Sequence, residues 1–260
     1  MGFRHMNPAS LATFNSSTSC NLLEEIDAGL TASIKSKDAE PKHRTFAPSS
    51  FRCARAMWFR LRGTQPDKKD SVDKQLDFFA HLGTSCHEYL QSTLVNQLKD
   101  NWIDVADYFE STDFSLDYDY CLEKSGHETL VEITRPYPIR FAVDGILRLD
   151  GTYYLLEIKT CMSDVFKDLT DPRPHHIDQV KCYSTILEIP NVLFVYIDRT
   201  YGDMKCYEYK VTSSDRTQVI DKFDSVMWSA EYNVAPDRLP SGDSWCSSAM
   251  CPYYRKCKDW

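Results

Sequence analysis

The chain has 260 residues, of which 42% are hydrophobic and 13% aromatic, so it can bury a substantial core and is not largely disordered. Its formal net charge of -8 excludes a protein that coats nucleic acid through its overall charge, because phosphate binding needs positive charge. The sequence lacks a membrane-length apolar run and a secretory signal, so we expect no membrane partner and a cytoplasmic location. That includes the cytoplasm of an infected host if a phage encodes the protein, and the Ser-rich, acid-poor N-terminus leaves organelle targeting as an alternative.

Apolar periodicity divides the chain into an N-terminal arm with one amphipathic helix, residues 1–45, and a single domain, residues 46–260. Helical spacing predicts four helices in that domain, over residues 51–62, 72–98, 175–188 and 215–232. Runs rich in β-branched and aromatic residues predict strands over residues 128–134, 139–149, 152–160, 191–199 and 204–212. The order of these elements is that of a mixed α/β domain.

Residues 42–69 carry eight Lys and Arg side chains against one acidic side chain. Such a segment can track a phosphate backbone, although a solvated helix face is the alternative. We expect the DNA contacts to come from the arginines of the predicted basic helix, namely Arg52, Arg55, Arg60 and Arg62.

The dipeptide Asp-Gly at residues 150–151 lies between two strand-like runs and favours a two-residue hairpin turn. Counting outward from this turn places Asp144 opposite Glu157. Side chains two residues apart on a strand project to the same face, so Lys159 joins the two carboxylates.

Two carboxylates that face each other repel, and a divalent cation would compensate their charge. Oxygen ligands of this kind suit Mg²⁺ or Mn²⁺, which can orient an attacking water and neutralise charge on a phosphate, while Lys159 activates that water. The alternative is a surface hairpin with a salt bridge between Glu157 and Lys159, worth at most about 1 kcal/mol. Apolar neighbours of Asp144 and Glu157 argue for buried strands and against that alternative.

The runs FAVDGILRLDG and LLEIKT resemble the Asp and Glu-x-Lys motifs of the PD-(D/E)XK nucleases. LGTSCHEYLQ and HIDQVKCYS resemble two further motifs of the RecB-type exonuclease branch of that superfamily. The resemblance implies a central mixed β-sheet flanked by helices, with an N-terminal helical region and a C-terminal tail joined by a metal cluster. It also implies that His87 and the main-chain carbonyl of Ile158 join the metal site, and that Gln179 and Tyr183 position substrate or metal from one helix face. Taken singly, His87 would be an ordinary structural histidine, and Gln179 with Tyr183 an ordinary helix flank.

Three cysteines lie close together in WCSSAMCPYYRKC and can converge on one metal centre: Cys246, Cys251 and Cys257. Together with PSSFRCARAMWFRLRG, this tail resembles the divided cysteine set of iron–sulfur nucleases, which include the AddB nuclease domain, exonuclease V and CRISPR-associated RecB-like nucleases. The resemblance implies Cys53 as the fourth ligand of a [4Fe-4S] cluster that staples the domain. Four residues separate Cys246 from Cys251 where the usual pattern has two, which leaves the cluster type open, and zinc is the alternative ion.

Together these motifs predict a Mg²⁺- or Mn²⁺-dependent deoxyribonuclease, an exonuclease that acts on single-stranded DNA ends in repair, recombination or phage DNA metabolism. One alternative is a structure-specific endonuclease, and another is a non-catalytic iron–sulfur module that binds nucleic acid with a nuclease-like fold. The sequence contains no G-x-x-x-x-G-K-[ST] segment to cradle nucleotide phosphates, so we expect a helicase or recombination partner to be a separate chain.

Overall fold

The computed structural model describes residues 16–39, 44–67, 73–240 and 242–260. These residues form two compact units, one with α1 (Ser16–Ala39) and residues 73–80, the other with residues 44–67 and 81 onward. In the first unit, the Asp27 carboxylate of α1 pairs with the ammonium of Lys74. The second unit contains both sheets and both candidate sites.

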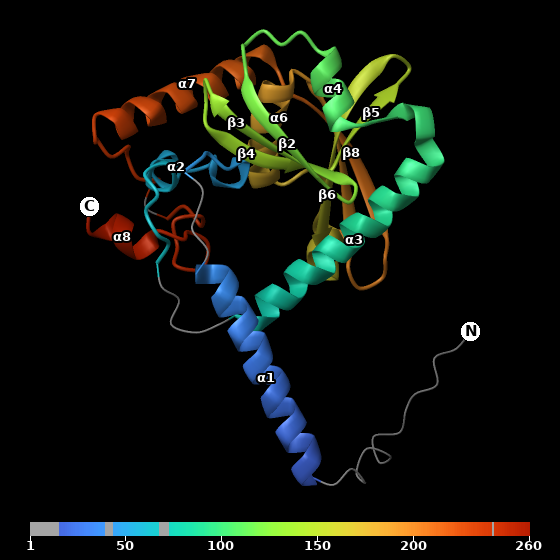
Figure 1. Cartoon of the computed structure of the whole chain (residues 1–260), viewed down its shortest axis with the longest axis vertical. Helices are drawn as coiled ribbons and strands as arrows, with labels where there is room; N and C mark the ends of the chain where they lie inside the picture. The colour runs from blue at the N-terminus through green and yellow to red at the C-terminus, as the bar shows by residue number, and fades with distance from the viewer. Residues whose placement is uncertain (1–15, 40–43, 68–72, 241) are drawn as a thin grey trace. The chain divides into compact units, whose positions relative to one another are not determined.

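The second unit is built on a five-stranded mixed sheet and a separate three-stranded antiparallel sheet (Figure 1). In the larger sheet β6 and β7 are parallel and the other neighbours are antiparallel. Its strands, in spatial order, are β1 (Trp102–Ile103), β5 (Gly145–Leu149), β6 (Thr152–Cys161), β7 (Asn191–Asp198) and β8 (Met204–Lys210). The smaller sheet consists of β2 (Asp119–Ser125), β3 (Glu128–Arg135) and β4 (Ile139–Val143).

Helices cover both faces of the larger sheet, which confirms the predicted mixed α/β fold with a central mixed sheet. On one face, Phe194 and Tyr196 are buried in the main core together with Val180 of α6 (Pro174–Leu187). On the other face, Leu90 of α3 (Lys74–Leu98) packs with Ile158 in a second hydrophobic cluster. Burial on both faces explains why β6 and β7 read as nearly continuous apolar runs.

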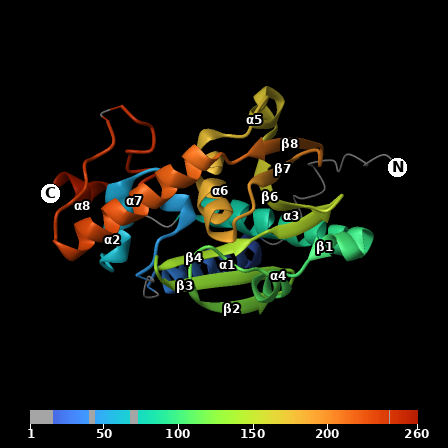
Figure 2. The same cartoon turned by 90° about the horizontal axis from the view of Figure 1, so that it is seen from above.

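α6 also contacts the smaller sheet, as Figure 2 shows from above. The ring of Tyr183 on α6 stacks on Phe141 of β4, with 5.5 Å between the ring centroids. The hydroxyl of the same Tyr183 reaches Glu157 on β6. One helix therefore links the two sheets next to the predicted catalytic residues.

The four helices predicted in this domain exist with ends shifted by a few residues: α2 (Ala54–Leu61), α3, α6 and α7 (Ser213–Glu231). The sequence did not predict several short elements, because a single helical turn or an exposed edge strand gives little periodicity. They are β1, β2, α4 (Val105–Ser111), α5 (Ser163–Asp168), α8 (Tyr254–Lys258) and 3-10 helices over Pro48–Ser50 and Lys99–Asn101. None of the helices in the described residues is long and apolar enough to cross a membrane.

The hairpin predicted at residues 150–151 is confirmed. Asp150 and Gly151 have φ values of 49° and 79°, the left-handed region that a two-residue turn of this kind requires. Leu149 pairs with Thr152, and the ladder continues as far as Gly145 and its partner on β6.

The strand predicted as one run over residues 139–149 is wrong, because β4 and β5 belong to different sheets. The chain bends at Asp144, between the end of β4 and the start of β5. The ring of Trp102 on β1 passes so close to Gly145 that a Cβ there would lie 2.5 Å from its Cη2 atom. Both halves of the run are apolar, so the sequence carried no sign of the break.

We expect Gly145→Ala to destabilise the protein by about 1–3 kcal/mol, because the added methyl group overlaps the Trp102 ring. Urea denaturation measures the loss. The matched test repeats the substitution in a Trp102→Leu background, where the overlap is relieved and the loss should be much smaller. An equal loss in both backgrounds would show that the ring is not the cause.

Candidate active site and cysteine site

Asp144 occupies the point where the chain leaves the smaller sheet and enters the larger one. The β3–β4 ladder ends at the residue before it, and the β5–β6 ladder begins at the residue after it. One residue beyond the last pair of each ladder, the neighbouring strand carries an acidic residue, Glu128 on β3 and Glu157 on β6. Asp144 is therefore flanked by one carboxylate from each sheet.

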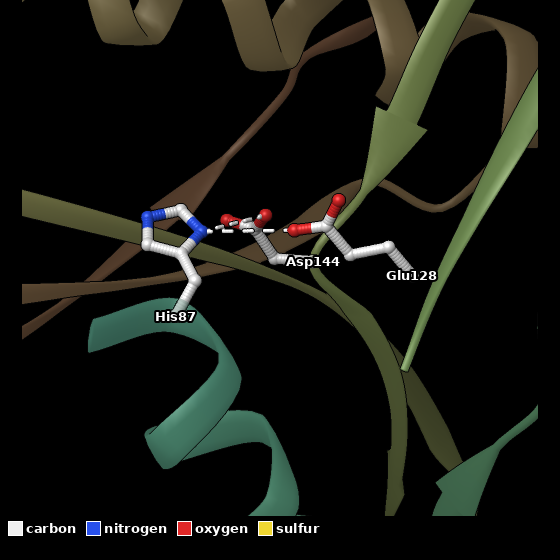
Figure 3. A group of neighbouring side chains, drawn as sticks. All are labelled: His87, Glu128 and Asp144. Carbon is white, nitrogen blue, oxygen red and sulfur yellow. Dashed lines mark ion pairs between the residues drawn. The ribbon is translucent and has the colours of Figure 1, made fainter. Parts of the chain in front are cut away.

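On the side of the smaller sheet, Asp144, Glu128 and His87 form a group that could hold a metal ion (Figure 3). The Nδ1 atom of His87 on α3 lies 3.3 Å from Oδ1 of Asp144 and 3.9 Å from Oε1 of Glu128. One ligand atom from each residue lies within 4.8 Å of the other two. Two carboxylate oxygens and one imidazole nitrogen suit a divalent ion such as Mn²⁺ or Mg²⁺.

The sequence did not identify Glu128 as a ligand. The available signal was the register of the β3–β4 hairpin, which brings Glu128 next to the position of Asp144. That register depends on the turn at residues 136–138, which has no dipeptide as diagnostic as Asp-Gly.

The protonation of this triad reflects its crowded negative charge. Burial raises the pKa of Glu128, and the nearby Asp144 carboxylate raises it further. Burial opposes the charged form of His87, but its hydrogen bond to Asp144 and the charge of that carboxylate raise its pKa overall. The crowded carboxylates therefore favour bound protons, and a divalent ion would compensate the same negative charge when bound.

On the side of the larger sheet, the other oxygen of Asp144 contacts the β6 strand. Oδ2 of Asp144 accepts a hydrogen bond of 2.6 Å from the main-chain nitrogen of Ile158. Glu157, which is 3% exposed, pairs through Oε1 with the ammonium of Lys159. The three predicted residues Asp144, Glu157 and Lys159 thus lie together.

The two residues predicted on α6 also reach this group. The hydroxyl of Tyr183 donates a 3.3 Å hydrogen bond to Oε1 of Glu157, and Gln179 lies beside Tyr183. Burial raises the pKa of Tyr183 well above its usual range, so the phenol stays protonated and remains a donor.

The predicted geometry differs in one respect. Asp144 does not pair with Glu157 within a ladder, because the ladder stops at Gly145 and the backbone bends there. The structure places His87 with Glu128, and Glu157 with Lys159, so that Asp144 is shared by two groups. Ile158 contributes its N–H to Asp144, while metal ligation by its carbonyl stays a prediction.

Burial raises the pKa of Glu157 above its usual range, to about 7, and the neighbouring Asp144 carboxylate adds to the effect, while Lys159 opposes it. Burial alone would lower the pKa of Lys159, but the charges of Glu157 and Asp144 raise it overall. We therefore describe Lys159 as an ammonium ion at neutral pH in the metal-free site.

The four cysteines of the predicted cluster line one cavity, together with Arg55 and Trp245. Cys53 directly precedes α2, Cys246 and Cys251 lie in the loop before α8, and Cys257 lies within α8. Burial, together with the three neighbouring cysteines, raises the pKa of the Cys251 thiol to about 11. The structure thus brings a residue before α2 next to three residues of the tail.

The tail is also held by contacts that involve no cysteine side chain. The main-chain nitrogen of Asp67 donates to the carbonyl of Pro252 at 2.7 Å. The carboxylate of Asp67 in turn accepts a 2.6 Å hydrogen bond from the main-chain nitrogen of Arg255. The segment after α2 and the C-terminal tail therefore pack together.

The arginines predicted to bind DNA make contacts within the protein. Arg52 pairs with Asp243 at 3.0 Å and with Asp178 at 3.5 Å. Arg55 is 9% exposed and donates from Nε to the carbonyl of Pro236 at 2.6 Å. These interactions fix α2 against the tail and α6.

The other two arginines are also in contact with the protein. Arg60 donates to the carbonyl of Thr45 at 2.9 Å, and the Arg62 guanidinium lies 4.7 Å from the ring centroid of Trp58. The run Arg55–Phe59 of α2 is buried while Arg62 is exposed, so only part of this helix is a solvated face, and Lys42, Lys68 and Lys69 lie outside the described residues. Contact of these four arginines with DNA stays a prediction.

The chain matches no family sequence profile and no curated protein. Among solved structures, SSO0001 has a TM-score of 0.53 and 17% identity over 90% of this chain and 97% of that one. LHK-Exo, an alkaline exonuclease from Laribacter hongkongensis, has a TM-score of 0.43 and 15% identity over 80% and 94%. Its complex with dAMP has a TM-score of 0.42 and 15% identity over 74% and 90%. Of these three, SSO0001 alone exceeds 0.5, and at 17% identity it shows a shared fold and nothing further.

Glu157→Gln tests the buried carboxylate in metal-free protein. The folded-state pKa of Glu157 is raised from 4.5 to about 7, so the folded state holds the proton more tightly, and its stability falls as pH rises through this range. The Gln variant lacks this slope. We subtract the free energy of unfolding of the variant from that of wild type, and we expect this difference to fall by on the order of 1–3 kcal/mol between pH 5 and pH 7.5.

Urea denaturation in EDTA across this pH range provides the measurement. The exposed Glu208→Gln on β8 is the matched control and should show a constant difference from wild type. A constant difference for Glu157→Gln as well would contradict the raised pKa.

Proposed function

We propose that this chain is a Mg²⁺- or Mn²⁺-dependent deoxyribonuclease of the PD-(D/E)XK superfamily, in its RecB-type branch, and an exonuclease on single-stranded DNA ends. One observation carries the proposal. The Asp144 carboxylate lies with His87 and Glu128 on one side, and on the other it accepts a hydrogen bond from the main-chain nitrogen of Ile158, between Glu157 and Lys159 on β6. A divalent ion and an ammonium group would thus act on the same phosphate.

The donor set supports a hard divalent ion. Two carboxylates and an imidazole surround a partly buried position, where the pKa of Glu128 and that of His87 are both raised. When bound, Mg²⁺ or Mn²⁺ supplies positive charge that stabilises the negative charge building on a phosphodiester.

Lys159 is the residue assigned to the attacking water. As an ammonium it has three donors and no lone pair, so it can orient the water oxygen and stabilise phosphate charge. Its position is fixed by Glu157, which is held in turn by the hydroxyl of Tyr183. We assign Gln179 and Tyr183 to holding this carboxylate.

The preference for DNA ends rests on the motifs that resemble the RecB-type branch. Cations beside the site are consistent with a nucleic acid substrate, since Arg173 and Lys159 lie near His175 at the start of α6. A role in repair, recombination or phage DNA metabolism, and a separate helicase or recombination partner, belong to the same proposal.

Asp144→Ala and Lys159→Ala should each reduce Mn²⁺-dependent cleavage of end-labelled single-stranded DNA by at least about 100-fold, because each removes a group that stabilises the transition state. Gel analysis of a time course measures the rate and the direction of cutting. The exposed Lys210→Ala on β8 is the matched control and should keep full activity.

A covalently closed single-stranded circle separates the alternatives. An exonuclease leaves the circle intact, whereas cut circles would favour the endonuclease alternative. Wild-type protein that binds DNA but cuts no substrate with Mn²⁺ would favour the non-catalytic binding module. Undiminished cleavage by both active-site variants would reject the site.

We further propose that Cys53, Cys246, Cys251 and Cys257 hold a [4Fe-4S] cluster. Four thiols in one cavity fit such a group, and the Arg55 guanidinium lies 4.0 Å from Sγ of Cys257.

Cys251→Ser should abolish visible absorbance and bound iron in protein purified without oxygen. It should also lower the unfolding free energy by up to about 4–5 kcal/mol, because the cluster joins Cys53 to the tail across nearly the whole domain. Absorbance spectra, metal analysis and urea denaturation measure these effects. The exposed Cys206→Ser on β8 is the matched control. Colourless wild-type protein with stoichiometric zinc and no iron would identify zinc instead.

A further inference from the structure

Gln91 is a buried polar residue beside the candidate metal triad. It lies on α3 four residues after His87, so the two side chains share one face of the helix. Only 1% of Gln91 is exposed, which is unusual for an uncharged polar residue unless its amide is fully hydrogen-bonded.

The amide of Gln91 contacts two of the three candidate ligands. Its Nε2 atom donates a 2.8 Å hydrogen bond to the main-chain carbonyl of Asp144. Its side chain also lies beside the carboxylate of Glu128. An amide nitrogen carries two hydrogens, so one group can serve both acceptors.

The carbonyl of Asp144 needs such a donor. Asp144 lies at the bend and belongs to neither ladder, so its backbone has no strand partner from the regular pairing of β3–β4 or β5–β6. A buried carbonyl without a partner costs about 1–3 kcal/mol. Gln91 therefore stabilises the irregular backbone that turns the Asp144 side chain toward His87 and Glu128.

We propose that Gln91 is the positioning residue of the metal site, which fixes Asp144 and Glu128 relative to His87 so that the three can bind one divalent ion. Each ligand comes from a different element, α3, β3 or the bend between β4 and β5. Gln91 joins all three, because α3 also carries His87. The proposal rests on the proposed metal-dependent function, and it assigns Gln91 no contact with substrate.

A purely structural role for Gln91 predicts a different result. It would lower stability and leave the affinity of the folded protein for metal unchanged. A positioning role weakens metal binding itself, and residues that orient metal ligands typically change affinity by about 10–100-fold.

The test compares Gln91→Met and Gln91→Asn with wild type. Met keeps the size but has no donor, and Asn keeps the amide but is one methylene shorter. Titration of metal-free protein with Mn²⁺, followed by electron paramagnetic resonance of the free ion, should show affinity weakened about 10–100-fold for Met and less for Asn. The exposed Gln97→Met on the same helix is the matched control and should bind as wild type does.

Cleavage of single-stranded DNA as a function of Mn²⁺ concentration provides a second readout. The Gln91 variants should need more Mn²⁺ for half-maximal rate and recover most of the wild-type kcat at saturation. Wild-type Mn²⁺ affinity in both variants would overturn the proposal. Thermal unfolding shows whether the Met variant folds. If it does not, the comparison of the Asn variant with wild type decides the test.

Failure of the proposed function has a distinct signature. If wild type binds Mn²⁺ through His87, so that His87→Ala loses binding, but cuts no DNA, the nuclease proposal fails while the role of Gln91 stands. If both Gln91 variants bind Mn²⁺ as wild type does and cutting is normal, the nuclease proposal stands and the role of Gln91 fails.

Discussion

The repulsion between carboxylates gathered around Asp144 is the constraint on which the rest of this site depends. One acidic residue from each sheet lies beside Asp144, since this residue joins the end of one ladder to the start of another. Three carboxylates this close are stable only if protons, an ammonium or a cation compensate them. Lys159 supplies an ammonium on one side, and on the other side burial and the neighbouring Asp144 raise the pKa of Glu128, while Asp144 raises that of His87 against the effect of burial.

The helices on the two faces of the sheet supply what the strands cannot. α3 contributes an imidazole and an amide, and α6 contributes a phenol and a second amide. All four groups are uncharged or weakly basic, so each can be buried beside the acidic residues at lower cost than a fourth carboxylate. The side chains of the two helices thus surround the crowded carboxylates of the strands and the bend, and together they form a site able to bind a divalent ion.

The region around α2 has a structural role that its charge alone did not indicate. Its arginines pair with carboxylates, carbonyls and an indole ring of the protein. This network holds α2 beside the tail, where Cys53 meets three cysteines from the other end of the chain. A basic segment can therefore be used to hold distant parts of the fold together, and its positive charge is then already partly compensated.

The sequence by itself determined the hairpin at residues 150–151, the main helices and the grouping of Asp144, Glu157 and Lys159, because turn chemistry and side-chain alternation act over a few residues. It did not determine that residues 139–149 form two strands, since both halves are apolar and only the Trp102 ring and the second sheet distinguish them. The sequence also did not identify Glu128 or Gln91 as residues of the site. Their roles arise from contacts between elements distant in the chain, and such contacts are decided by how the sheets and helices pack.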